Sequence, residues 1–207
     1  MNTTIRRQVL LASGAAATLP ALAPFAASEV AGLEPGLLKR VVGQDHVIAA
    51  VAGAIRRSAF GAPVADGPVS FLFLGPRGVG KTQLARALAE QLLGTEAALL
   101  RVDLTRRLNL DLGWLAEAAS QRRVILLDEV DRAAGDVLES IARLLRGDLP
   151  RSTVGLRNAI VILTSGAGTV GRVLTGAPRH LREQLLASTH ETVTFRQIDW
   201  RQFRRGR

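Results

Sequence analysis

The stretch that decides the fold is Val69-Ser70-Phe71-Leu72-Phe73-Leu74-Gly75-Pro76-Arg77-Gly78-Val79-Gly80-Lys81-Thr82. Its first six residues make an apolar run of the length of a strand that is buried on both faces. The next eight carry three glycines, whose backbone N–H groups can curl around phosphate oxygens, and then a lysine and a threonine. A helical pattern follows, with its leucines on one face: Leu84, Leu88 and Leu92. A strand, a glycine-rich loop and a helix in this order predict a phosphate-binding P-loop.

This loop has predicted roles toward a nucleoside triphosphate and Mg²⁺. All eight residues are expected to line the phosphates: Gly75, Pro76, Arg77, Gly78, Val79, Gly80, Lys81 and Thr82. The Lys81 ammonium would bridge the β- and γ-phosphates and assist catalysis, and the Thr82 hydroxyl would bind Mg²⁺. Lys81 and Lys39 are the only lysines among 27 Lys and Arg residues, which indicates that position 81 needs a compact ammonium. The structural alternative is a glycine-rich turn without a ligand.

A second apolar run, residues 124–127, ends in the carboxylates of Asp128 and Glu129. Taken alone, such a strand end is usually an exposed surface feature. It follows the P-loop at an interval that leaves room for one intervening strand, which favours a functional pair. We therefore expect Asp128 to hold Mg²⁺ through water and Glu129 to act as the general base that polarises the attacking water.

The rest of the chain completes an alternation of strands and helices. Three further apolar runs have the character of strands, the last more weakly: residues 99–102, 159–163 and 192–195. Residues 44–58 have the pattern of an amphipathic helix. A second helical face is apolar at Val137, Ile141, Leu144 and Leu145. This alternation predicts an α/β fold with a mostly parallel five-stranded sheet covered on both faces.

Length and composition limit the classes of function. A chain of 207 residues with 47% hydrophobic residues suits one domain with a proper core. It has no cysteine, which excludes disulfides, thiolate zinc sites and cysteine nucleophiles, and its three histidines lack metal-ligand spacing. The net charge of +9 lies mostly at the ends, with +2 in residues 1–28 and +4 in residues 196–207. We therefore favour a soluble domain with basic ends over a nucleic-acid-binding protein.

Residues 1–28 have the parts of a targeting segment. Arg6 and Arg7 precede an uncharged, alanine-rich run with small residues where a peptidase could cut. The pattern resembles a twin-arginine signal and predicts export to the periplasm, which is not an obvious source of ATP; a working ATPase would favour the cytoplasm. The alternative is an alanine-rich or disordered extension. The predicted organisation then continues with a nucleotide-binding domain over 29–195 and a basic tail over 196–207.

Four segments carry a family resemblance: Leu37-Leu38-Lys39-Arg40-Val41-Val42-Gly43-Gln44-Asp45, Ser70-Phe71-Leu72-Phe73-Leu74-Gly75-Pro76, Ile125-Leu126-Leu127-Asp128-Glu129-Val130 and Arg157-Asn158-Ala159-Ile160-Val161-Ile162-Leu163-Thr164-Ser165. In this order they resemble the second AAA+ module of Clp-type unfoldases and ClpB-type disaggregases. The resemblance implies a P-loop NTPase core, a three-layer sandwich with a five-stranded parallel sheet, that binds ATP and Mg²⁺. It also implies an adenine pocket lined by Val41, Val42 and Gly43. In that family such modules form hexameric rings that thread protein chains, which implies a homo- or hetero-oligomer and a protein client.

One departure from the family concerns the grip on a client. The family carries a glycine-aromatic-valine-glycine pore loop before the strand that ends in the Asp-Glu pair. Only 20 residues, 104–123, fill that interval here, and they contain Gly113-Trp114-Leu115 but no such motif. Trp114 could be a substitute grip, but we favour a packed aromatic on a helix face. A substrate-gripping loop is therefore expected to be missing.

Three further departures concern hydrolysis. The polar sensor of the family, an asparagine, falls on Gly166, and glycine cannot orient a water. The arginine finger, which raises rates roughly 10³- to 10⁵-fold in related enzymes, aligns with Ser188, although Arg182 is close. The chain ends at Arg207, so the small helical lid and its second sensor arginine are expected to be absent. Torsins, from the same branch, likewise lack the aromatic pore loop and borrow an arginine from a partner.

The resemblance and the departures together predict an ATP-binding AAA+ protein of Clp or chaperone type that hydrolyses ATP slowly or only with partner subunits. The alternative is a non-hydrolysing nucleotide-binding pseudoenzyme or assembly module that changes its partner contacts when ATP is bound. A third possibility, a DNA-associated P-loop ATPase, depends only on the charge.

Overall fold

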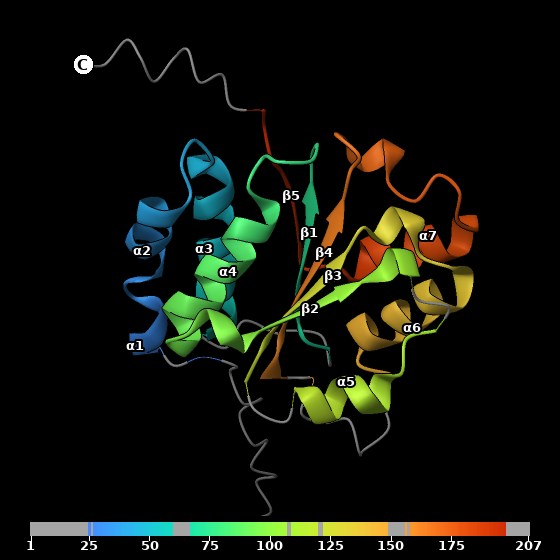
Figure 1. Cartoon of the computed structure of the whole chain (residues 1–207), viewed down its shortest axis with the longest axis horizontal. Coiled ribbons are helices and arrows are strands. Elements are labelled where there is room, and N and C mark those ends of the chain that lie inside the picture. The colour runs from blue at the N-terminus through green and yellow to red at the C-terminus, as the bar shows by residue number, and fades with distance from the viewer. Residues whose placement is uncertain are drawn as a thin grey trace, which may run out of the picture.

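A parallel sheet forms the centre of the molecule. The computed structural model describes residues 25, 27–59, 67–106, 109–119, 122–148, 156 and 158–197. The strands formed by these residues are β1 (Val69–Leu74), β2 (Leu99–Asp103), β3 (Val124–Asp128), β4 (Ile160–Ser165) and β5 (Glu191–Thr194). All neighbours pair in parallel, in the order β2-β3-β4-β1-β5 (Figure 1). The strand that leads into the P-loop therefore lies inside the sheet, between β4 and β5.

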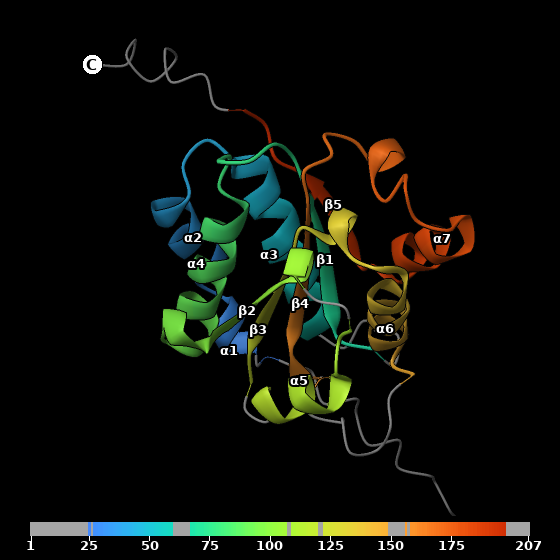
Figure 2. The same ribbon diagram turned by 45° about the vertical axis from the view of Figure 1, so that its right-hand side comes forward.

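Helices cover both faces of this sheet, as the views in Figures 1 and 2 show. One face carries α1 (Ala27–Val30), α2 (Leu33–Arg40), α3 (Asp45–Ala59) and α4 (Lys81–Leu93). The core on the other side includes residues of α5 (Leu112–Ala118), α6 (Gly135–Arg146) and α7 (Arg179–Ser188). Short 3₁₀ turns join the elements at η1 (Glu96–Ala98), η2 (Leu104–Arg106), η3 (Val130–Arg132) and η5 (Val170–Arg172). The predicted three-layer α/β sandwich with five parallel strands is confirmed.

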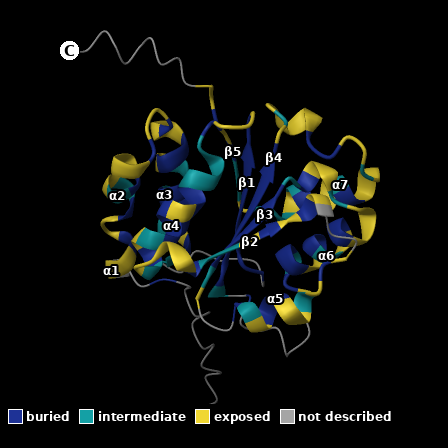
Figure 3. Cartoon of the chain, viewed as in Figure 1, coloured by how far each residue is buried: buried dark blue, intermediate teal, exposed yellow. Residues whose placement is uncertain are grey.

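Strand residues alternate between two cores, and β1, β3 and β4, whose residues are all buried, are dark blue in the burial colouring of Figure 3. Phe71 and Phe73 of β1 pack with the helices α1 to α4, whereas Leu72 and Leu74 pack with α5 to α7. A strand covered on both faces needs apolar residues at every position, which is why the run in β1 is nearly continuous. Its one polar residue, Ser70, is buried with its hydroxyl 2.8 Å from His190 Nδ1.

The predicted elements are confirmed to within one or two residues at their ends. The helix expected over 44–58 spans Asp45–Ala59, and the strand expected over 159–163 spans Ile160–Ser165. The apolar faces predicted for α4 and α6 are buried: Leu84, Leu88, Leu92, Val137, Ile141, Leu144 and Leu145. Among the described helices, none has the length and apolar character needed to cross a membrane.

The folded part begins before residue 29. Phe25 is only 1% exposed and packs in the core with α1 to α4, and the Arg122 guanidinium lies 5.4 Å from the centre of its ring. Arg122 also forms an ion pair with Glu29 at 2.8 Å. Residues 1–24 of the predicted targeting segment and residues 198–207 of the basic tail lie outside the described residues.

Candidate functional site

A cavity of about 700 Å³ lies where the carboxyl ends of the parallel strands meet. The P-loop, the end of β3 and the residues after β4 all line it. In open α/β sheets, ligands bind in the crevice at this edge of the strands. The cavity brings together most of the predicted phosphate and metal residues: Arg77, Gly78, Gly80, Lys81, Thr82, Asp128 and Glu129. The volume lies within the range of small-molecule sites, which is on the order of 300–1,000 Å³.

The backbone of the P-loop adopts conformations that suit glycine. Gly75, Gly78 and Gly80 have φ of 136°, 82° and 105°. At Gly75 a side chain is also excluded by space, because an added Cβ would lie 2.8 Å from the carbonyl oxygen of Phe195. The Gly75 N–H donates to the Ala167 carbonyl at 2.8 Å, which joins the loop to the segment after β4. The loop then feeds α4, whose N-terminus favours an anion.

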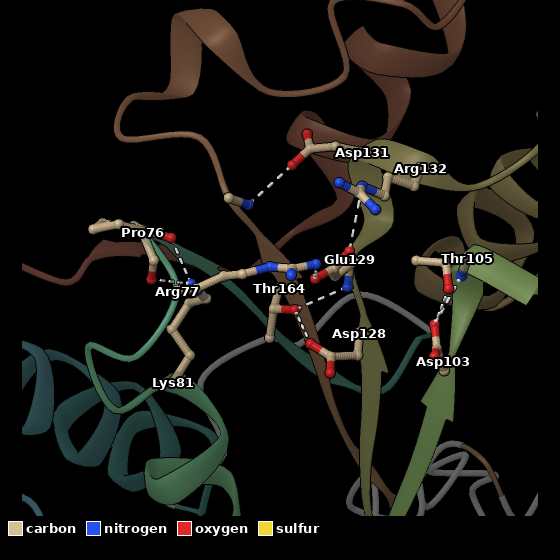
Figure 4. Close-up of polar contacts among 12 residues, drawn as sticks. Pro76, Arg77, Lys81, Asp103, Thr105, Asp128, Glu129, Asp131, Arg132 and Thr164 are labelled. Carbon is tan, nitrogen blue, oxygen red and sulfur yellow. Dashed lines mark hydrogen bonds and ion pairs between the residues drawn. The ribbon is translucent and has the colours of Figure 1, made fainter.

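The Lys81 ammonium lies inside this loop. Its Nζ donates to the carbonyls of Gly75 (2.5 Å) and Pro76 (2.7 Å), as Figure 4 shows. Burial lowers the pKa of Lys81 below its ordinary value, while Asp128 and Glu129 partly oppose that shift. Among the described residues, the hydrogen bonds of this half-buried cation go to neutral carbonyls, so it gains from an anionic ligand that replaces lost solvation with charge.

Asp128, the last residue of β3, is held from two sides. Arg101 of β2 donates to its Oδ2, through Nε at 3.0 Å, and the Thr164 hydroxyl of β4 donates to its Oδ1 at 2.5 Å. A carboxylate has about four lone-pair sites, two on each oxygen, so Oδ1 keeps one lone pair that a metal ion or a water could use. Asp128 lines the cavity, and the carboxylate and the Thr82 hydroxyl are oxygen donors of the kind that Mg²⁺ prefers. The residues present therefore fit a magnesium ion.

Glu129 has a strained backbone and one unsatisfied oxygen. Its φ of 61° and ψ of 53° lie in the left-handed region that non-glycine residues seldom adopt, and its N–H donates to the Thr164 hydroxyl at 3.0 Å. Arg77 forms an ion pair with Oε1. Arg132 Nε lies 3.4 Å from Oε2, but this contact does not have the geometry of a hydrogen bond. Oε2 is buried and has no hydrogen-bond partner among the described residues. Backbone strain and a buried acceptor without a hydrogen-bond partner are both typical of functional sites.

The segment after β4 turns its polar groups toward Asp131. The Asp131 carboxylate accepts from the Ser165 hydroxyl, from the Gly166 N–H at 3.1 Å and from the Leu174 N–H at 3.0 Å. Gly166, the predicted sensor position, lines the cavity, and a Cβ added there would meet nothing within 4 Å. The site therefore has room at this position but no side chain that could orient a water.

Three side chains of the site were not singled out from the sequence: Arg101, Thr164 and Asp131. Arg101 interrupts the apolar run of β2, and Thr164 does the same in β4. A charged or polar residue near the carboxyl end of a buried parallel strand was the available signal, since that edge of the sheet holds the cavity. Asp131, two residues beyond Glu129, was missed because its role depends on a segment more than thirty residues away.

Other predicted residues lie apart from the cavity lining. Val41 is buried beside the P-loop, with Cγ1 3.7 Å from where a Gly80 Cβ would be, whereas Val42 is 57% exposed. Gly43 follows them with φ of 73°. None of the three is among the described residues that line the cavity, so the adenine pocket remains a prediction from the resemblance.

The positions considered for an arginine finger and a grip also lie elsewhere. Ser188 accepts a hydrogen bond from Ser70 at the start of β1, the opposite edge of the sheet from the cavity. Arg182 donates to the carbonyls of Val170 (3.3 Å) and Gly171 (2.9 Å), so its guanidinium supports the loop before α7. Trp114 is 39% exposed, more than expected for a packed aromatic, because the next two residues, Leu115 and Ala116, take the buried side of α5.

Comparison with known proteins agrees with this architecture. The family model described as ATPase family associated with various cellular activities (AAA) matches residues 71–167. The chaperone protein ClpB 1 of Thermosynechococcus vestitus is 34% identical to this chain, over 83% of this chain and 24% of its own length. The chain spans roughly a quarter of the length of the curated relatives that it matches first.

Solved structures give the same relationship. The Hsp104–ADP complex of S. cerevisiae has a TM-score of 0.68 and 28% identity, covering 84% of this chain and 37% of the Hsp104 chain. The extended conformation of the S. cerevisiae Hsp104:casein complex has a TM-score of 0.67 and 27% identity, covering 84% and 36%. Taken with the fold and the two motifs at its cavity, these matches show that the chain belongs to the AAA+ proteins of the Clp/ClpB type.

Proposed function

We propose that the cavity binds ATP with Mg²⁺ and that the chain hydrolyses ATP slowly, or at a higher rate only when a partner subunit supplies an arginine. The observation that carries this proposal is the meeting of the P-loop, Asp128 and Glu129 at one cavity. A phosphate-binding loop, a metal-binding carboxylate and a base are the parts that phosphoryl transfer to water needs. Membership of the AAA+ family supports a nucleotide as the ligand.

Each residue has a role that its surroundings support. Lys81 would exchange the carbonyls of Gly75 and Pro76 for phosphate oxygens. Thr82 and Asp128 would hold Mg²⁺, which neutralises phosphate charge when bound. Glu129, whose side chain lines the cavity, would polarise the attacking water.

The same surroundings support slow turnover. Gly166 offers no side chain to orient the water, and Arg182 is bonded to backbone carbonyls. An arginine finger contributes roughly 10³ to 10⁵ in rate in related enzymes, and neither position considered for it, Ser188 or Arg182, is among the described residues that line the cavity. A partner's arginine is therefore part of the proposal.

The binding part is tested with Mg-ATP and two lysine substitutions, each followed by calorimetry. Lys81→Ala removes the charge inside the loop and is expected to weaken binding by about 10- to 100-fold. Lys39→Ala is the matched control, because Lys39 is the only other lysine and is exposed on α2. Equal affinities of the Lys81→Ala protein and the wild type would contradict the proposal.

A nucleotide-binding assembly module without turnover is the second candidate function. The pairing of Glu129 with Arg77 favours it, because the ion pair occupies Oε1, which is then not available to a water. The two candidates differ in single-turnover hydrolysis of bound ATP. A Glu129→Gln protein that is slower than the wild type supports the ATPase; equal rates support the module.

We further propose that the chain works in an oligomer and acts on a protein client. The support is indirect: the solved relative Hsp104 has a structure in complex with casein. Analytical ultracentrifugation with and without ATP tests the assembly, and a monomer under both conditions would contradict it.

A further inference from the structure

Arg77 reaches across the candidate site to the predicted base. It is the third residue of the P-loop, and its guanidinium forms an ion pair with Glu129 Oε1 (Figure 4). Its side chain is 74% exposed, whereas that of Glu129 is 25% exposed. Both residues line the cavity. The contact therefore joins the loop proposed to bind phosphate to the carboxylate proposed to activate water.

In the described structure three arginines pair with the carboxylates of Asp128 and Glu129, but only one of the three belongs to the P-loop. Arg101 lies on β2 and contacts Asp128, while Arg132 lies on η3 and is 3.4 Å from Glu129 Oε2. Arg77 alone follows directly on Gly75 and Pro76, whose carbonyls hold Lys81 Nζ. Burial is the main cause that lowers the pKa of Lys81, and the charge of Arg77 adds to it.

A terminal phosphate would compete with Glu129 for this guanidinium. An exposed arginine–carboxylate pair in water stabilises little, so it is easily exchanged. A phosphate group offers several charged oxygens and can accept two parallel N–H bonds from a guanidinium. The general base must lie next to the phosphate that water attacks, so a cation beside Glu129 lies at the terminal phosphate.

We propose that Arg77 is a specificity-determining residue, which favours nucleoside triphosphates over diphosphates by exchanging the Glu129 carboxylate for the terminal phosphate. The same exchange frees Glu129 Oε1 when a triphosphate is bound. A diphosphate leaves Arg77 on Glu129. This inference depends on the proposed nucleotide binding.

The first test compares affinities for ADP and for the non-hydrolysable analogue adenosine 5′-(β,γ-imido)triphosphate, both with Mg²⁺, by calorimetry. Arg77→Gln is expected to weaken binding of the triphosphate about tenfold and of ADP less than about twofold. Arg179→Gln is the matched control, because Arg179 is an exposed residue of α7 paired only with Glu183 in the described structure. Equal weakening for both nucleotides, or no weakening, would overturn the inference.

The second test is a double-mutant cycle on triphosphate binding with Glu129→Gln. If Arg77 leaves Glu129 for the phosphate, Glu129→Gln removes both the pair that must break and the repulsion that follows. Its gain in affinity is then larger with Arg77 present than in the Arg77→Gln background. If Arg77 stays on Glu129, the gain in affinity is instead larger in the Arg77→Gln background. Only in that background is the Glu129 carboxylate left unshielded from the phosphate. An equal gain in both backgrounds also overturns the exchange.

These outcomes are separable from those of the proposed function. A wild-type protein that binds neither nucleotide contradicts nucleotide binding itself. A wild-type protein that binds both, with a triphosphate preference that Arg77→Gln leaves unchanged, contradicts only the role of Arg77.

Discussion

The P-loop and the segment between β4 and η5 line the same cavity and are joined by the bond from the Gly75 N–H to the Ala167 carbonyl, yet they present different groups. The P-loop directs Lys81 and Thr82 to the cavity. At the other wall, Ser165 at the end of β4 and the Gly166 N–H both bond to Asp131, and Gly166 stands at the position where a side chain could reach a water. The P-loop wall therefore presents groups that can bind phosphate and metal. The polar groups of the other wall are used in hydrogen bonds to Asp131.

This difference separates binding from turnover. Phosphate binding needs correctly placed donors and a cation, which the P-loop wall supplies locally. Rapid hydrolysis needs groups that touch the water and the developing charge, and these come from several elements or from another subunit. A chain can therefore keep the first property while losing most of the second.

Alanine substitutions of one glycine on each wall should give the largest difference between the two walls. Gly75→Ala places a side chain at φ of 136° and 2.8 Å from the Phe195 carbonyl, so we expect a loss of about 3 kcal/mol in unfolding free energy. Gly166→Ala enters open space at a conformation that other residues adopt, and should change stability by less than about 1 kcal/mol. Urea unfolding of both proteins measures this. Equal destabilisation at the two glycines would show that the walls do not differ as described.

A polar side chain at position 166 should raise turnover without changing binding. Gly166→Asn adds an amide that can hydrogen-bond a water, and we expect ATP hydrolysis to rise up to about tenfold with little change in ATP affinity. Gly168→Asn is the control, because a Cβ there also meets nothing within 4 Å, but the residue is not among those that line the cavity. Steady-state phosphate release distinguishes the two. A slower Gly166→Asn protein would mean that the glycine itself is needed.

The smallest expected effect is a pH dependence confined to the P-loop wall. The folded-state pKa of Lys81 is lower than its ordinary value of 10.5, mainly because of burial. Between these two values the unfolded chain binds more protons than the folded one, so stability without nucleotide rises with pH in that window. Nucleotide affinity should fall over the same window as the ammonium loses its charge. Unfolding curves of the wild type and Lys81→Met against pH test this, and identical slopes would rule out Lys81 as the source.

The fold followed from local patterns, whereas the contacts within the site did not. Apolar runs and helical faces give the elements because burial acts on each of them separately, and the P-loop is readable because its glycines and Lys81 are adjacent in sequence. Arg101 and Asp128 are 27 residues apart, and Ser165 reaches Asp131 over 34. Such pairs depend on how strands are ordered and on which rotamers fill the cavity. The 39% exposure of Trp114 was not predictable for a similar reason, since the face that α5 turns to the core is set by its neighbours.

The central claim is that one cavity binds ATP well and turns it over slowly without help. A single-turnover experiment on the purified chain, with Mg-ATP bound at saturation and quenched over time, measures both properties in one sample. We predict stoichiometric binding and a hydrolysis rate on the order of 10⁻² s⁻¹ or slower, as expected for a P-loop site without an arginine from a second subunit. Absence of bound ATP, or a rate of several per second for the isolated chain, would contradict the account.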